Sequence, residues 1–178
     1  FKGYTIKLGD NLHLNYENWT PIGATGKFEG TFDGNGKAIE GLRVYTEGKA
    51  SAGLFANCIG TIKNLTVIDA EIYGHYKAGV IVGDGLCAKI DNCHVENAKV
   101  VVTPYKKDDA NNVGGIVGYL SAEPTAYVKN CSVKNAEITA YRKVAGIVGA
   151  ANGASEVSGN TVENVTVTAD QTVKYVSN

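Results

Sequence analysis

Apolar and polar positions along this chain follow a six-residue pattern that recurs five times. Each copy begins with Ile or Val, has Asn or Gly in third place and ends with Val, at residues 39–44, 62–67, 90–95, 128–133 and 157–162. Between the copies lies a second phrase, in which Gly precedes apolar residues, at residues 52–55, 78–83, 114–118 and 145–149. Repetition at this spacing predicts the stacked units of a solenoid.

The copies are separated by 23, 28, 38 and 29 residues, so the phrases are constant while the gaps vary. Alternating β-branched residues flanked by Gly or Asn indicate short strands, about three to each coil. Equivalent strands of successive coils would pair in parallel, roughly 4.8 Å apart. We therefore predict an all-β fold, a right-handed parallel β-helix of about five coils with an atypical N-terminal cap. A β-sandwich would require tight antiparallel hairpins, of which the sequence shows few.

The chain of 178 residues is expected to form a single β-helix domain. Residues 1–38 would make the N-terminal cap and first coil, with Trp19 and Phe28 covering the core, residues 39–167 the repeats, and residues 168–178 a terminal strand. The first residue is Phe1 and the sequence contains no Met, which suggests a part of a longer polypeptide.

Asn64, Asn92 and Asn130 occupy the third position of three consecutive copies, where Gly41 and Gly159 stand in the first and last. Asn and Gly tolerate the left-handed backbone region that a corner needs, so these positions are predicted to be corners. Stacked Asn side chains could also hydrogen-bond along the solenoid axis. A ligand-binding row of Asn is the alternative, and the tie to the turn disfavours it.

The four cysteines are predicted to be structural. Cys93 and Cys131 stand where Leu65 stands in another copy, which indicates buried free thiols. Cys58 and Cys87 each precede the strand of their coil and are a candidate disulfide pair. A Cys-x-x-Cys motif is lacking, so the sequence gives a zinc site almost no support.

Charge and hydropathy narrow the classes of partner. The net charge is −1 and the pI about 6.3, without the basic excess of a nucleic-acid-binding protein. Apolar runs fall short of the ~20 residues that a transmembrane helix needs. The run from Asp33 to Gly36 begins like a calcium loop, but Val44 stands where that loop needs Glu, so we predict a turn there and neither a metal nor a cofactor.

Further residues carry a family resemblance: Trp-x-Pro-Ile-Gly at 19–23, Phe-x-Gly-Thr-Phe-Asp-Gly-Asn-Gly-Lys at 28–37, and then the repeated phrases described above. This order of motifs, which covers about residues 4–167, resembles the GLUG-repeat proteins, bacterial surface and secreted proteins frequent in Bacteroidetes. They include adhesins and non-catalytic regions of IgA-specific metallopeptidases. The resemblance implies a β-helix in an extracellular or cell-surface location and carries no catalytic residue over. The chain also lacks the His-Glu-x-x-His motif of metallopeptidases.

If the repeats are scaffold, binding belongs to the variable loops. In each of four coils, the loop before the glycine-rich strand has Tyr followed by a basic residue. The predicted ligand-binding residues are Tyr73, Tyr76, Lys77, Tyr105, Lys106, Lys107, Tyr141, Arg142 and Lys143. Tyr rings beside cations suit sugars and acidic groups. The alternative is that the rings pack over the coil edge while Lys and Arg keep that edge soluble.

Three functions are compatible with these observations. The first is a non-enzymatic surface or secreted module, an adhesin or binding scaffold for a protein or glycan partner. The second is a polysaccharide-binding or polysaccharide-cleaving β-helix, for which Asp108 and Asp109 are the best available carboxylates. The third is a structural spacer without a ligand. Adjacent Asp beside two Lys is typical of a solvated loop, so we expect the chain not to be an enzyme.

Overall fold

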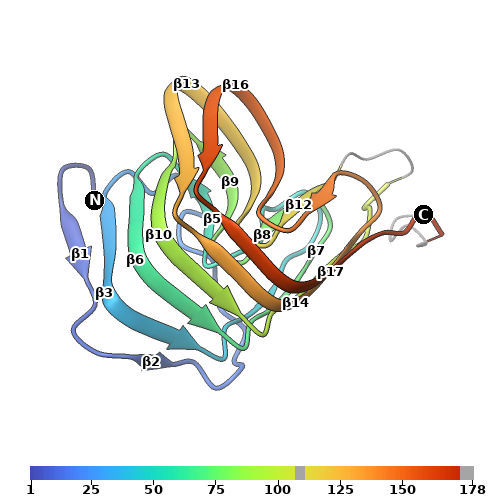
Figure 1. Ribbon diagram of the computed structural model, residues 1–178, viewed down its shortest axis with the longest axis horizontal. Coiled ribbons are helices and arrows are strands. Elements are labelled where there is room, and N and C mark those ends of the chain that lie inside the picture. Colours follow the sequence, from blue (N-terminus) through green and yellow to red (C-terminus); the bar gives the residue numbers. More distant parts are fainter. Residues whose placement is uncertain (107–110, 173–178) are drawn as a thin grey trace.

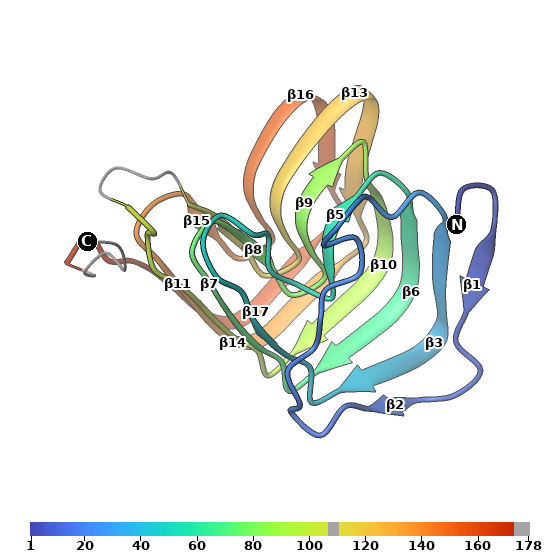
Figure 2. The same cartoon turned by 180° about the vertical axis from the view of Figure 1, so that it is seen from behind.

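The computed structural model describes residues 1–106 and 111–172 of the chain. Within these ranges all regular structure is β-strand, and successive coils stack into a parallel solenoid of about six turns (Figures 1 and 2). The predicted parallel β-helix is confirmed. Every strand pairing recorded between coils is parallel, which is what the stacking of equivalent phrases requires.

The strands fall into a few stacks, each holding equivalent strands of successive coils. The longest stack is β1 (Thr5–Lys7), β3 (Thr31–Glu40), β6 (Thr61–Ile68), β10 (Lys89–Glu96), β13 (Val117–Lys129) and β16 (Val148–Ser158). Beyond the first corner, β2 (Leu12–His13) pairs with the end of β3, and β14 (Ser132–Ala140) pairs with the end of β10 and with β17 (Thr161–Ala169). Beyond the second corner, β4 (Arg43–Tyr45), β7 (Glu71–Gly74) and β11 (Lys99–Val102) stack in order and continue onto the later part of β14. The glycine-rich phrases supply β5 (Phe55–Cys58), β8 (Lys77–Gly79), β9 (Val82–Leu86), β12 (Asn112–Gly114) and β15 (Val144–Ala145).

Each repeating coil turns two corners five residues apart, and both use a left-handed residue. The first corner holds Asn64, Asn92, Asn130 and Gly159, with φ between 50° and 65°. The second holds Gly41, Asp69, Asn97, Asn135 and Asn164, with φ between 51° and 70°. Asn, Asp and Gly are the residues that adopt this conformation at least cost, so the predicted corner function of the Asn row is confirmed.

The register corrects the alignment of the first copy. Ile39 pairs with Val67 and Phe32 pairs with Ile62, so residues 39–44 are equivalent to the second corner of later coils rather than to the first. Gly41 therefore shares its position with Asp69 and not with Asn64. The alignment failed because each coil contains the apolar-x-Asx-apolar-x-apolar phrase twice, once at each corner.

The core runs along the inside of the solenoid and consists of the inward-facing apolar residues of every strand. Glycines let the coils approach closely at the glycine-rich phrase. A Cβ on Gly114 would meet the backbone of Val117, Ile147 and Gly149, which cannot move aside. These glycines are therefore required by packing between coils rather than by any chemistry.

The N-terminal end of the core is covered by aromatic rings. Phe28 is buried and its ring centroid lies 5.0 Å from that of Phe55, while Phe32 contacts Phe55 edge-on at 5.4 Å. Trp19 packs against the core and donates its indole N–H to the Leu54 carbonyl at 3.2 Å. The predicted covering residues Trp19 and Phe28 are thus confirmed.

Charges alternate from coil to coil along two columns of outward-facing residues. One column reads Lys7, Asp33, Lys63, Asp91 and Lys129. The other reads Arg43, Glu71, Lys99 and Glu137. Ion pairs join Lys63 to Asp33 and Arg43 to Glu71, both at 3.6 Å. Opposite charges facing each other across strands contribute roughly 0.2–1 kcal/mol a pair, so the columns favour this stacking order.

The candidate disulfide between Cys58 and Cys87 is wrong, because the two thiols are not bonded and lie at different levels of the solenoid, facing different partners. Cys58 pairs with Gly85 and is buried in the core. Cys87 lies two residues further on, at a left-handed corner with φ 60°, and its thiol contacts the Glu123 carbonyl at 2.5 Å. The corner therefore turns Cys87 towards the following coil and away from Cys58.

Candidate functional site

The predicted tyrosine and basic residues lie where β4, β7, β11 and β14 end, along one edge of the solenoid. We call this surface, made by Tyr45, Tyr73, Tyr76, Tyr105 and Tyr141 with the basic residues beside them, the tyrosine edge. Tyr45 is 53% exposed, whereas Tyr73, Tyr76 and Tyr105 are half-buried and Tyr141 is buried. Lys106 and Lys143 are exposed, and Arg142 is half-buried with its guanidinium 5.1 Å from the centroid of the Tyr141 ring. Lys107, Asp108 and Asp109 lie outside the described residues.

Three rings from successive coils form a column on this edge. The ring centroid of His75 lies 6.4 Å from Tyr45 and 6.3 Å from Tyr105. His75 is buried, and its Nδ1 lies 2.9 Å from the Thr103 hydroxyl and 3.1 Å from the Thr103 carbonyl. We call Tyr45, His75 and Tyr105 the aromatic column. Sequence reasoning placed Tyr105 on the edge but did not count His75 among the predicted ligand-binding residues.

Lys77, which was predicted to meet a ligand, is held inside a cluster of its own. Its Nζ lies 2.6 Å from Asp84 Oδ2, and the two side chains are only 14% and 25% exposed. The same Nζ stands 4.4 Å from the centroid of the Tyr119 ring and 5.3 Å from that of Tyr76. Asp84 pairs with Tyr119 across the neighbouring strands β9 and β13, which positions both residues around the ammonium group. Lys77 and Tyr76 therefore stabilise the edge from within.

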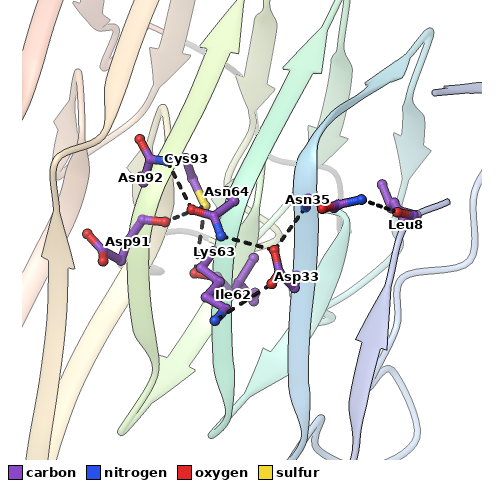
Figure 3. Close-up of polar contacts among 9 residues, drawn as sticks. All are labelled: Leu8, Asp33, Asn35, Ile62, Lys63, Asn64, Asp91, Asn92 and Cys93. Atoms are coloured by element: carbon purple, nitrogen blue, oxygen red, sulfur yellow. Dashed lines mark hydrogen bonds and ion pairs between the residues drawn. The ribbon is translucent and has the colours of Figure 1, made fainter. Parts of the chain in front are cut away.

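Asparagine ladders follow both corners along the solenoid. At the first corner Asn64 donates to Asp33 and Asn92 donates to Asn64, both at 3.0 Å (Figure 3). At the second corner the chain of bonds runs from Asn164 to Asn135 to Asn97 to Asp69, at 3.3, 3.2 and 3.0 Å. Each of these ladders begins on an Asp, which only accepts hydrogen bonds when ionised. The amides are thereby satisfied by one another.

Asp33 has the best-defined electrostatic environment of the first ladder. Its carboxylate accepts from the Asn64 amide and from the backbone N–H of Asn35 at 2.9 Å, which closes the predicted turn (Figure 3). These hydrogen bonds, with Lys63 and Lys7 nearby, lower the pKa of Asp33 below its usual value. The partners of the Asp33 carboxylate in this structure are thus the Asn64 amide, the Asn35 backbone N–H and the Lys63 ammonium group.

A shallow groove of about 290 Å³ follows the second corner. Tyr16 stands at its N-terminal end, the ladder residues Asp69, Asn97 and Asn135 line it, and Glu71, Lys99 and Glu137 add alternating charge. Sequence reasoning missed this groove because it recognised only one corner phrase in each coil. The signal was present in the second phrase, Val67 to Ile72, which has the same alternation as the first.

The remaining candidates contribute no convergent site. Cys93 and Cys131 are buried, as the sequence predicted. His94 is half-buried, with Nδ1 2.8 Å from the Ser132 hydroxyl and Nε2 3.2 Å from the side-chain Oδ1 of Asn92. Across residues 1–106 and 111–172, no three His, Cys, Asp or Glu side chains gather as a metal site would require. Nor does that part of the chain contain a helix with the length and apolarity to cross a bilayer.

Similarity to known proteins is limited to part of the chain. No family model matches it, and no solved structure matches it. It is 35% identical over 98 residues to halomucin of Haloquadratum walsbyi, an alignment that covers 54% of this chain and 1% of halomucin. The chain therefore corresponds to a very small part of that much longer protein.

Proposed function

We propose that this chain is a non-enzymatic module of a bacterial secreted or surface-attached protein, and that it acts in adhesion by binding an acidic glycan at the tyrosine edge. The β-solenoid and the partial similarity to halomucin fit a surface-type module. The resemblance to GLUG-repeat proteins supports the same location. The adhesive function rests on the edge itself.

The aromatic column carries this proposal. Tyr45, His75 and Tyr105 come from three successive coils, and Tyr45 keeps half of its surface in solvent. The face of an aromatic ring packs against the C–H face of a sugar, while its hydroxyl reaches the polar substituents. Lys106 follows Tyr105 in sequence and is exposed, and Lys143 is exposed on the next coil. Such cations pair with the carboxylates or sulfates of an acidic glycan.

The test is binding of the purified chain to a printed array of acidic and neutral oligosaccharides. We expect acidic oligosaccharides to bind, and the double variant Tyr45→Ser/Tyr105→Ser to lose at least about tenfold in affinity, because two stacking surfaces are removed. Tyr4→Ser is the matched control, since Tyr4 is 73% exposed but belongs to the N-terminal cap. Equal binding by both variants, or no binding at all, would contradict the proposal. Release of reducing ends from any polysaccharide would contradict its non-enzymatic part.

The groove at the second corner favours one alternative, a polysaccharide lying along the solenoid axis. Amide and charged side chains repeat in it once per coil, and Tyr16 at its end is 45% exposed. In that case Tyr16→Ser and Lys99→Gln would reduce binding to the same array while Tyr45→Ser/Tyr105→Ser would not. A chain without binding in any variant would be a structural spacer.

A further inference from the structure

Two cysteines of neighbouring coils lie directly over each other in the core. The pairing of Asp91 with Lys129 and of His94 with Ser132 brackets Cys93 and Cys131, so they occupy the same level of adjacent parallel strands. Neighbouring strands are roughly 4.8 Å apart. That separation falls within the Cα range of about 4.4–6.8 Å that disulfides span.

The side chains share one environment as well as one level. Both are almost wholly buried, at 0% and 1% exposure, and each thiol contacts the carbonyl two residues before it, at 3.3 Å for Cys93 and 3.0 Å for Cys131. Figure 3 shows Cys93 beside Asn92 on β10, with its sulfur towards Asn64 and the Ile62 carbonyl of the preceding coil, 3.7 Å away. Contact with the Cys131 thiol, together with burial, raises the pKa of the Cys93 thiol. The thiols are therefore mutual neighbours rather than two isolated groups.

The backbone ladder between the two coils is interrupted at this point. The pairing of β10 with the next coil stops at Asp91 and resumes at His94, because β13 ends before the corner and β14 begins after it. The amide of Cys131 donates not to the preceding coil but to Asn160 Oδ1 of the following one, at 2.8 Å. The sulfur–sulfur bond would therefore lie in a gap of the backbone ladder between the two coils.

We propose that Cys93 and Cys131 form a disulfide that joins neighbouring coils when the protein folds in the presence of a small-molecule disulfide. In thiol–disulfide exchange, one cysteine thiolate attacks the small disulfide and releases one small thiol. The second cysteine thiolate then attacks this mixed disulfide, which forms the bond and releases the other small thiol. The protein loses two electrons and two protons, and the small disulfide gains them. The bond forms during folding, before burial closes off both sulfurs.

Neither of the other cysteines competes for this partner. Cys58 is buried at a different level, paired with Gly85, and burial raises the pKa of its thiol to about 12. Cys87 faces the Glu123 carbonyl beyond its corner. The disulfide would close a segment of 38 residues, the longest spacing between copies of the repeat. It would therefore fasten the coil that carries the largest insertion.

The experiment uses the variant Cys58→Ala/Cys87→Ala, which leaves only the proposed pair and alters neither of its members. It is refolded from denaturant with oxidised and reduced glutathione, or with dithiothreitol alone. We expect the oxidised product to be lighter by two hydrogen atoms, to resist alkylation when unfolded, and to yield a peptide joining Cys93 to Cys131. Because a closed loop restricts the unfolded chain, its Tm should exceed that of the reduced form by roughly 10 °C.

A second arm keeps the four cysteines in place, so that the choice of partner is tested in the unaltered chain. Recovery of Cys93–Cys131 as the disulfide peptide supports the proposal. Recovery of a bridge to Cys58 or Cys87 overturns it, as does a refolded protein whose Cys93 and Cys131 both remain alkylatable on unfolding. Equal Tm values for the oxidised and reduced forms would also contradict a bond between coils. These outcomes do not depend on whether the tyrosine edge binds a glycan.

Discussion

The asparagine corners and the tyrosine edge belong to the same coils but are built in different ways. At the corners, the same residue type makes the same contact in successive coils, as the chain from Asn164 to Asp69 illustrates. At the edge, the contacts differ from coil to coil: His75 is buried between rings, Lys77 is paired with Asp84, and Arg142 covers Tyr141. A contact that is copied in every coil serves the stacking itself. The edge, whose contacts are not copied, is therefore the surface to which we assign the proposed binding.

Substitution of Lys77 is expected to have the largest effect on stability, because this edge residue makes contacts that stabilise the fold. Replacing Lys77 by Met leaves Asp84 without its ion pair and removes the cation from Tyr119, and should cost about 2 kcal/mol of unfolding free energy. Lys143→Met is the matched control, since Lys143 is the register equivalent of Lys77 on a later coil but is exposed. Urea denaturation of both variants measures the difference. Equal stabilities would show that the cluster contributes nothing.

Substitution of Asn97 tests how much the asparagine corners contribute to stability. Asn97→Ala removes the hydrogen bonds to Asp69 and from Asn135 and places Ala at φ 54°, which we expect to cost about 1.5 kcal/mol. Asn97→Gly keeps the left-handed backbone and loses only the side-chain bonds, so it should cost less. The Tm of each variant would reveal the order. If Gly were as harmful as Ala, the ladder bonds rather than the backbone conformation would dominate the corner.

The smallest expected effect is the loss of stability at acidic pH that arises from Asp33 in the first ladder. The pKa of Asp33 is lowered in the folded chain, chiefly by the hydrogen bond from Asn64. Its stabilising contribution is therefore fully present above the ordinary carboxyl pKa of 3.8 and is lost as the pH falls through the lower folded value. Asp33→Asn should flatten the decline of the urea midpoint below pH 4, whereas Asp10→Asn, at a side chain 90% exposed, should leave it unchanged. An unaltered decline in Asp33→Asn would exclude this contribution.

Most of the fold follows from the sequence because its determinants are local. The third-position Asn or Gly marks a left-handed corner without reference to the rest of the chain, and the alternation around it fixes which residues enter the core. What failed was register: Leu42 is equivalent to Ala70 rather than to Leu65, because two corners of one coil carry the same phrase. Only the pairing between coils distinguishes the two corners.

The candidate site was less predictable from the sequence. Its contacts join residues of neighbouring coils that lie different numbers of positions after the corner of their own coil. Tyr45 is in register with Tyr73, yet its ring contacts His75, two residues further along the next coil. Tyr119, in β13, reaches Lys77, in β8, because β13 pairs with β9 of the preceding coil. Neither relation is periodic, so a repeat-based alignment cannot indicate it. The candidate disulfide between Cys58 and Cys87 failed for the same reason. It rested on the position of Cys87 in the sequence, whereas the corner at Cys87 turns its side chain away from Cys58.

The alternating charge columns favour the gain or loss of coils in even rather than odd numbers. Each interior coil carries one acid and one base in opposite columns, as with Lys63 and Glu71, and the next coil inverts them as Asp91 and Lys99. Loss of that next coil would bring Lys63 onto Lys129 and Glu71 onto Glu137, like charge upon like in both columns. Loss of the two coils that carry Lys63 and Asp91 would instead bring Asp33 onto Lys129 and Arg43 onto Glu137, which restores the alternation. Lengthening or shortening by whole coils is therefore favoured in even steps.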